Sequence, residues 1–366
     1  MVELIRDVEA FNRLAPEWEA LTTRSSVRNP FVTHAWLANW LDAFGDGCHG
    51  AILERAGGRA IAAAFVRDQG TSLSGPEAHT YWTEVLDEGD EALAALFGRL
   101  AREGGGRLSL PGSAEGAYRE RLTRAAAGKF VVVPKNPWTS RAIGVEGSLS
   151  QFLSGKPPKL RAELGRKRRK LERELGPVEL LDLSGAPTAP GAMAIVEQVE
   201  RGSWKKDAGT AIVCSERETR FYRGVAALEA RGARGRLFAL AVRGEPVAYV
   251  LGLEHERSYY ALKTSYLAEL AGTAPGIVLL CRVIERLAEE GRISAIELLG
   301  RDARWKQELA TSKRTHCSYE LLPRGAWSAL YSVAHEFVRP NVRRVADGVI
   351  KALSEARLFE RRGGGE

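Results

Sequence analysis

Cysteine and long apolar runs are both scarce in this chain of 366 residues. The four cysteines are widely scattered and form neither a CxxC pair nor a cluster, which argues against structural zinc and a disulfide framework. No apolar segment approaches the roughly 18–20 residues that a membrane span requires. The first residues lack the basic start and apolar centre of a signal peptide. We therefore expect a reduced, cytoplasmic protein that binds no metal.

Excess positive charge is absent outside one segment. The formal net charge is +7, and the segment from Lys156 to Glu174 alone supplies +6, through nine Lys or Arg and three acidic residues. This segment contains no aromatic residue on which bases could stack, and the rest of the chain is nearly neutral. Both facts disfavour a nucleic acid as the partner.

The basic segment has the pattern of a helix that begins after Pro157-Pro158. Its leucines, at positions 160, 164, 171 and 175, fall on one helical stripe, and its charges cover the other faces. We expect the stripe to pack between the two halves of the protein and the charges to face an anionic substrate or membrane surface. The tail from Trp327 to Phe359 is also amphipathic, which predicts peripheral contact with the inner face of a membrane.

The stretch from Arg236 to Ala310 carries the strongest local signals. Three short runs of β-forming residues, separated by turns, predict a meander of strands. A periodic apolar run then predicts a helix that begins near Pro275 and ends at Gly291, followed by a strand and a short helix. A strand, a glycine-bearing loop and a helix N-terminus in this order can cradle an anion such as a pyrophosphate.

The loop at the start of that helix, Thr273-Ala274-Pro275-Gly276, is the candidate anion site. Backbone N–H groups would hold phosphate oxygens there, and Gly276 allows close approach because it has no side chain. An ordinary helix start is the alternative, since proline is common in the first turn. The equivalent helix of the first half follows Asp87-Glu88-Gly89-Asp90-Glu91, whose four carboxylates would repel a phosphate. We therefore expect one such site, in the second half.

Both halves have the same predicted element order, β-α-α-β-β-β-α-β-α-β, which indicates a tandem repeat. The predicted fold class is α/β (α+β), with two domains that each form a mixed, mostly antiparallel sheet flanked by helices. The expected divisions are an N-terminal domain at 1–134, an irregular connector and the basic helix at 135–176, a C-terminal domain with the anion site at 177–323, and the amphipathic tail at 324–366.

Several short motifs occur in an order found in one enzyme superfamily. They are Asn29-Pro30-Phe31 with Trp36 and Trp40, Leu171-Glu172-Arg173, Ser203-Trp204-Lys205, Tyr260-Ala261-Leu262-Lys263, Ala274-Pro275-Gly276, and Gly300 before Trp305-Lys306. With the element order, they make residues 1–322 resemble the GNAT acyltransferase superfamily in its tandem form. The chain is similar to the CelD/BcsL-like acetyltransferase domain family and, more distantly, to Fem-type aminoacyl transferases.

The resemblance implies acyl transfer with acyl-CoA as the co-substrate and no metal. The compact Q/R-x-x-G-x-G/A loop of typical GNAT enzymes is missing, so the segment from Thr273 to Gly276 must take its place. Its motifs contain the candidate catalytic residues Lys263, Lys306 and Tyr260 and the candidate substrate-binding residues Trp204, Lys205 and Trp305. From the residues themselves, Glu297 on the strand after the helix is the best candidate for a general base.

Three of these residues also have a simpler interpretation. Lys263 lies in the middle of a predicted strand, where a lysine needs a carboxylate or ligand partner unless its stem reaches the sheet edge. Glu297 on an apolar strand would have a raised pKa that suits a general base, or it could be a rim carboxylate in an ion pair. Lys306 could meet a phosphate, polarise the thioester carbonyl or lie in solvent.

Three functions stay open from the sequence. The first is an acyl-CoA N-acyltransferase whose acceptor is an amino sugar of a surface polysaccharide or a lipid amine such as a sphingoid base. The second is a Fem-like transferase that takes aminoacyl groups from tRNA. The third is a catalytically inactive tandem module that binds a partner through its tail.

Overall fold

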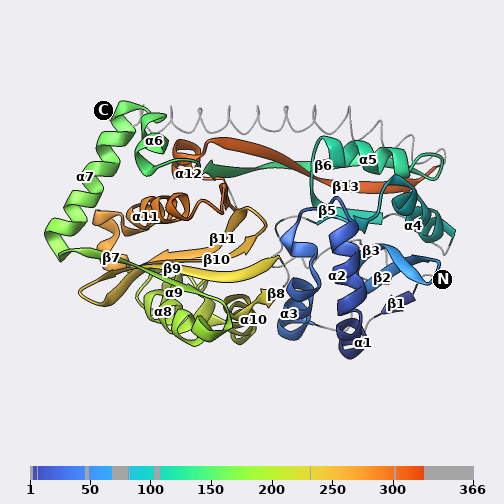
Figure 1. Ribbon diagram of the computed structural model, residues 1–366, viewed down its shortest axis with the longest axis horizontal. Helices are drawn as coiled ribbons and strands as arrows, with labels where there is room; N and C mark the ends of the chain where they lie inside the picture. The colour runs from blue at the N-terminus through green and yellow to red at the C-terminus, as the bar shows by residue number, and fades with distance from the viewer. Residues whose placement is uncertain are drawn as a thin grey trace, which may run out of the picture.

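The computed structural model describes residues 3–5, 7–45, 49–67, 81, 83–102, 108–230, 232–300 and 302–324. Figure 1 shows two halves side by side, with the first half near the N-terminus and the second half at the other end of the molecule. The predicted α/β class, with mostly antiparallel strands flanked by helices, is confirmed. The expected amphipathic tail lies outside the described residues.

The first half holds two packed layers of strands and helices. Its elements are β1 Glu3–Ile5, α1 Val8–Arg13, α2 Ala15–Arg24, the 3-10 turn η1 Pro30–Val32, α3 His34–Phe44, β2 His49–Ala56, β3 Arg59–Arg67, β4 Leu86–Asp87, α4 Asp90–Arg102, β5 Leu108–Ala114, α5 Ala117–Ala125 and β6 Phe130–Gly144.

The second half repeats this order after two connecting helices. Its elements are α6 Leu149–Ser154, α7 Pro158–Leu175, β7 Val178–Ser184, η3 Ala186–Thr188, α8 Ala189–Arg201, α9 Trp204–Asp207, η4 Ile212–Cys214, α10 Glu216–Ala227, β8 Glu229–Ala230, β9 Ala233–Val242, β10 Glu245–His255, β11 Ser258–Tyr266, η5 Ala268–Thr273, α11 Pro275–Glu290, β12 Ala295–Leu298, α12 Arg304–Leu309 and β13 Ser312–Pro323.

Strands β6 and β13 form a long antiparallel ribbon that belongs to both halves (Figure 1). Their register runs from Phe130 opposite Pro323 to Ala142 opposite Ser312. β5 pairs with one end of β13, whereas β12 pairs with the far end of β6. The order in the larger sheet is thus β5-β13-β6-β12-β11-β10-β9-β7. Each half therefore takes the strand beside β5 or β12 from the other half, a reciprocity that fits the predicted repeat.

This ribbon corrects one expectation. The segment from Pro134 to Gly155, expected as an irregular connector, is instead the second part of β6 followed by α6. The expected division at residue 134 falls inside β6, while the domain limits themselves stay a prediction.

An aromatic cluster joins the two halves. Phe31 on η1 lies edge-on against Tyr260 on β11, with ring centroids 5.7 Å apart, and Trp36 on α3 lies 5.2 Å from Phe221 on α10. All four side chains are buried. Burying a side chain of this size stabilises the fold by roughly 1.5–3 kcal/mol, so the two halves share one hydrophobic core.

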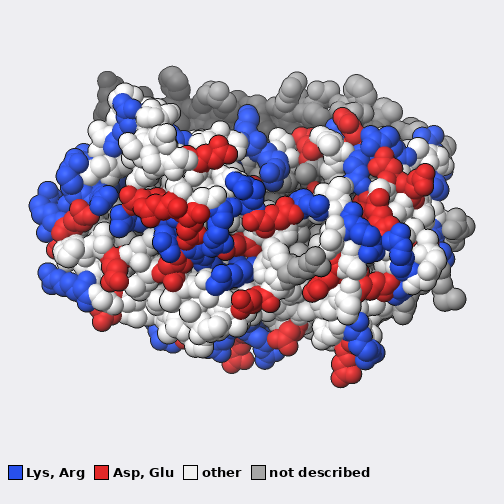
Figure 2. All heavy atoms as spheres, in the orientation of Figure 1, with Lys and Arg blue, Asp and Glu red and all other residues white. Residues whose placement is uncertain are grey.

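The basic helix α7 lies elsewhere than expected. Its leucines are buried as the stripe predicts, with Leu164 and Leu171 as the innermost, but they pack in the core of the second half against α11. The expected position between the halves is therefore wrong, because the aromatic cluster and the ribbon already fill that interface. Figure 2 shows Lys and Arg side chains gathered at the end of the molecule where α7 lies.

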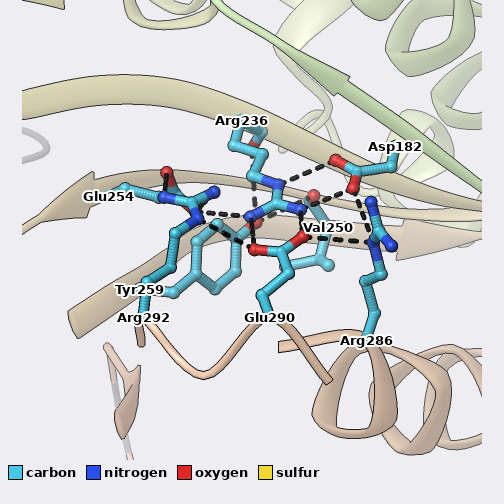
Figure 3. A network of polar contacts seen from close by, with 8 residues as sticks. All are labelled: Asp182, Arg236, Val250, Glu254, Tyr259, Arg286, Glu290 and Arg292. Atoms are coloured by element: carbon cyan, nitrogen blue, oxygen red, sulfur yellow. Dashed lines mark hydrogen bonds and ion pairs between the residues drawn. The ribbon is translucent and has the colours of Figure 1, made fainter. Parts of the chain in front are cut away.

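A buried ion network fastens α11 to the sheet (Figure 3). The guanidinium of Arg236 on β9, only 3% exposed, bonds to Asp182 on β7, Glu254 on β10 and Glu290 at the end of α11. Arg286 and Arg292 complete the network from the exposed side. Hydrogen bonding from Arg236 is the main cause that lowers the pKa of Glu290. The network thereby fixes the direction in which α11 leaves the loop before it.

Replacing Arg236 tests this role. Arg236→Met should lower the free energy of unfolding by about 3–5 kcal/mol, because it leaves buried carboxylates without their cation. Urea unfolding at pH 7 measures the loss. Since the pKa of Glu290 is lowered in the folded protein, this stabilisation is present above the ordinary value of 4.5 and should fade as the pH falls below it. Arg286→Gln, at a side chain 46% exposed, is the control and should have little effect. Equal losses in the two variants would contradict the assignment.

Candidate active site

The centre of the candidate site is a break in the sheet between β11 and β12. These parallel strands pair only over Ser258–Ala261 and Ala295–Leu298, and β11 then continues alone on that side to Tyr266. At the point where they part, the register of β11 against β10 shifts, with Ala261 opposite Gly252 but Lys263 opposite Leu251. Leu262 is thus the extra residue of a β-bulge, which re-aims the side chains that follow it.

After the bulge, the side chain of Lys263 points toward helix α10. Its ammonium lies 3.3 Å from the carboxylate of Glu218 and 5.4 Å from the ring centre of Tyr222. A partner carboxylate for this lysine was expected, but its source was not. Ser215 is the N-cap of α10, and its hydroxyl accepts a hydrogen bond from the N–H of Glu218. The N–H of Ser215 donates to the carbonyl of Ile212 and not to the Glu218 side chain. The Glu218 carboxylate is therefore available for Lys263.

Lys205 lies on the same side, on the short helix α9. It donates to the carbonyl of Thr264 on β11, and its ammonium lies 3.8 Å from the fully buried carboxylate of Glu200. Burial lowers the pKa of Lys205 to about 8. Tyr249 also donates to Glu200 at 2.6 Å. Trp204 is 53% exposed, so α9 presents an uncovered indole beside this polar group.

Tyr260 and Glu297 form the next part of the site. They are opposite each other in the pairing of β11 with β12, and both are buried. Burial raises the pKa of Glu297, and the charge of Arg314, 3.5 Å away on β13, works in the opposite direction. Burial also raises the pKa of Tyr260, and the charge of Glu297 adds to that rise. The raised pKa expected for Glu297 is confirmed in direction.

The first half contributes residues that the sequence did not single out. The hydroxyl of Tyr81 donates to the carbonyl of Leu262, the bulged residue, at 3.1 Å. Burial raises the pKa of Tyr81 to about 12. Burial likewise raises the pKa of Glu84 to about 6, while Asn29 and Arg314 work against that rise. Tyr81 and Glu84 come from a loop of the first half, and only the folded interface brings Tyr81 to β11.

The candidate anion loop lies at the end of β11. Ala274 has the left-handed conformation, with φ of 53°, and is the N-cap of α11. The hydroxyl of Thr273 donates to the carbonyl of Leu270, and the N–H of Ile277 donates to the carbonyl of Ala274. Because Pro275 has no N–H, Gly276 supplies the unbonded donor that a first helical turn ordinarily offers. The loop can hold a phosphate oxygen, but with fewer backbone donors than a glycine-rich loop.

A cation from α7 lies against this loop. The ammonium of Lys170 donates to the carbonyl of Gly272 at 3.0 Å. In the first half, by contrast, the carboxylates before α4 bind the protein's own arginines: Asp87 and Asp90 bind Arg121, and Glu88 binds Arg24. The expectation of repulsion omitted these arginines. The outcome is the same, because that helix end is already neutralised.

Trp305 and Lys306 lie on α12, which follows β12, and Lys306 does not lie in solvent. Lys306 is buried and donates to the carbonyl of Leu299, and its ammonium lies 5.6 Å from the ring centre of Trp305. Burial lowers the pKa of Lys306. This contact fastens α12 to the end of β12, so the geometry favours a structural role for Lys306.

The sheet opened at a bulge beside a helix N-terminus lies in the part of the chain that matches a known family. Residues 158–307 match the family model of the acetyltransferase (GNAT) domain, and this part of the chain belongs to that family. This match supports the GNAT-type acyltransferase that the motifs predicted. No curated protein sequence matches the chain.

Solved structures with the same fold extend over both halves. A conserved protein of unknown function from Bacteroides thetaiotaomicron has a TM-score of 0.57 at 12% identity, and the match covers 88% of this chain and 100% of that one. FemX has a TM-score of 0.58 at 9% identity, with 84% and 95% covered. A C-terminal domain described as that of a lysylphosphatidylglycerol synthetase from Agrobacterium fabrum has a TM-score of 0.52 at 12% identity, with 88% and 97% covered. At such identities the likeness shows a shared fold alone.

Two further findings concern the described residues only. They contain no group of three or more His, Cys, Asp or Glu side chains that could hold a metal ion. None of the helices formed by these residues combines the length and apolarity needed to cross a membrane.

The role of Lys306 can be tested directly. Lys306→Met should lower the free energy of unfolding by about 1–3 kcal/mol, because a buried carbonyl loses its donor. Thermal and urea unfolding measure the change. Arg304→Met, on the same helix but 90% exposed, should unfold like the parent. If Lys306→Met unfolds like the parent yet loses acyl transfer, then the lysine acts on the substrate.

Proposed function

We propose that the protein transfers an acyl group from a CoA thioester to an amine acceptor. The observation that carries this proposal is the opening between β11 and β12 at the Leu262 bulge. The anion loop follows β11, and polar side chains of both halves, Tyr81 and Lys263 among them, lie at the bulge. In the reaction, the amine nitrogen attacks the thioester carbonyl carbon, the carbon–sulfur bond breaks, and an amide forms. The thiolate leaves as CoA, and the ammonium proton passes to a base.

The residues of the cofactor loop fit the phosphates of CoA. Gly276 offers an N–H at a helix N-terminus, and Lys170 places a cation beside Gly272. CoA would supply the activated thioester. The bulge leaves Leu262 outside the regular ladder, so we assign the peptide N–H groups at this position to the oxyanion that develops on the thioester carbonyl.

The acceptor side carries the charge that an amine requires. Glu218 contacts Lys263 just after the bulge, Glu297 lies opposite Tyr260 just before it, and Tyr81 donates to the carbonyl of Leu262. We assign Glu297 as the general base, since burial raises its pKa toward the range in which a base works efficiently. Lys263 and Lys205, each paired with a carboxylate, hold the geometry of this side.

The acceptor class that we favour combines an amine with a bulky body, as in an amino sugar or a lipid amine. The exposed indole of Trp204 beside the polar group supports a partly apolar or ring-shaped acceptor. A Fem-like transfer from aminoacyl-tRNA is the second candidate, favoured by the fold shared with FemX.

Ligand binding and turnover test the donor. At 100 times its dissociation constant, an acyl-CoA of suitable chain length should stabilise the fold by about 2.7 kcal/mol, visible as a rise in Tm. Thiol release should then require both this acyl-CoA and an amine. A panel of C2 to C18 acyl-CoAs that neither raises Tm nor releases thiol with glucosamine or sphinganine would refute the proposal. Transfer from aminoacyl-tRNA under those conditions would establish the second candidate.

The pH dependence of kcat/KM tests Glu297 as the base. A base acts in its deprotonated form, so activity should rise as the pH passes upward through a pKa above the ordinary 4.5 of a glutamate. Glu297→Gln should remove this limb and lower kcat/KM by roughly 10²–10⁴-fold. Arg314 lowers the pKa of Glu297, so Arg314→Gln should move the limb to higher pH. A limb that persists in Glu297→Gln would assign the base elsewhere, with Glu218 next to be tested.

A further inference from the structure

Helix α7 crosses the donor end of the site. Just before α7, Lys156 donates to the carbonyls of Leu309 and Ala310 at the end of α12, at 2.6 and 2.9 Å. Near its other end, Lys170 donates to Gly272 in the loop that follows β11. Figure 1 shows α7 beside α6 and α11 at the outer end of the second half. The helix is therefore tied to both segments that border the opening between β11 and β12.

One flank of α7 faces this opening. Hydrogen bonding from Lys167 lowers the pKa of Glu163, and the charges of Arg166 and of Arg304 on α12 contribute further. Glu163, Arg166 and Lys170 are three and four residues apart, so they lie on one side of the helix. The buried leucines lie on another face, against α11. The flank between α12 and the anion loop thus carries Arg166 and Lys170.

The charges on this flank are incompletely neutralised by the helix itself. Lys167 and Arg168 form ion pairs with Glu163 and Glu172 at 2.7 and 3.0 Å. The ammonium of Lys170 lies 3.9 Å from the carboxylate of Glu174, a longer and weaker ion pair. In the described part of the chain Arg166 has no ion-pair partner. An exposed arginine and a half-buried lysine beside an anion loop form a site for phosphate oxygens, because both donate charge-assisted hydrogen bonds.

The loop itself gives a reason for such a site. Pro275 has no N–H and the N–H of Ile277 is already bonded, so the backbone offers few donors to a pyrophosphate. A cation from a neighbouring element can supply the missing charge. Resting on the proposed use of CoA, we propose that Arg166 and Lys170 bind the phosphates of the acyl donor and replace the donors that the loop lacks.

A membrane surface fits the α7 flank less well. A helix that lies on a membrane inserts an apolar face, whereas the apolar stripe of α7 is buried in the core of the second half. The large apolar side chains exposed among the described residues are Val8 and Trp204, and neither lies on α7. The flank therefore has charged side chains but no exposed apolar side chain that could insert into a membrane. Its charges lie beside the anion loop.

The test compares three ligands on two variants. Arg166→Gln with Lys170→Gln should weaken binding of CoA by about 10- to 100-fold, the loss of one or two charge-assisted contacts, and binding of 3′-dephospho-CoA by an equal or smaller factor. Binding of pantetheine, which has no phosphate, should be unchanged. Arg161→Gln is the matched control, because Arg161 is an exposed arginine of α7 about 140° around the helix from Arg166 and about 180° from Lys170. Isothermal titration calorimetry at one fixed salt concentration measures all three.

The outcomes separate this proposal from the function on which it rests. If the parent binds no CoA, the proposed function and this inference fall together. If the parent binds CoA and the double variant binds it as Arg161→Gln does, only this inference is overturned. Loss of binding to phosphatidylglycerol vesicles with CoA affinity retained would overturn it in favour of a membrane surface. If the double variant has a lowered Tm, Arg166→Gln alone serves as the test, because it leaves the contact of Lys170 with Gly272 intact. It should still weaken CoA binding and leave pantetheine binding unchanged.

Discussion

The shared ribbon of β6 and β13 is the constraint on which the rest of the structure depends. It holds β12 through the pairing of Ala295–Leu298 with Arg141–Gly144, and so sets how far β12 can follow β11. Arg141 in turn forms a two-point ion pair with Asp302, at 2.7 and 2.9 Å, just after β12. With the ribbon fixed, β11 and β12 must part after four residues. The site opens there because the two strands are held by different neighbours.

Much of the second half could be predicted from local sequence. Helix α11 begins at Pro275 and ends before Gly291, as its proline and glycine indicate, because both residues act through their own backbone geometry. The second part of β6 could not be predicted, since Pro134, Asn136 and Pro137 have the composition of a loop. The structure explains them. That part of β6 pairs with β13 on one side, while β12 reaches only residues 141–144, and proline is tolerated where one side of a strand is free.

The candidate site shows the same division between local and distant signals. Lys263, the loop at residues 273–276 and Glu297 could be selected as candidates because each has an unusual residue at a recognisable place in a strand or helix start. Tyr81 could not be found, because its partner is the carbonyl of a residue 181 positions away and any carbonyl could serve. The basic helix had the right pattern of leucines, but only the packed core could show which surface they cover.

The pairing of β5 with β13 has a consequence for how the protein emerges from the ribosome. β5 comes from the first third of the chain, but its strand neighbour is β13. Ser113 cannot pair until Cys317, some 200 residues later, has been synthesised. During synthesis the first half is therefore left with an unpaired edge until the second half has been made. Contacts of such long sequence separation slow folding, and an unpaired edge invites association with other chains. Chaperone dependence during translation, rather than stability after it, is where this architecture should limit the yield of active enzyme.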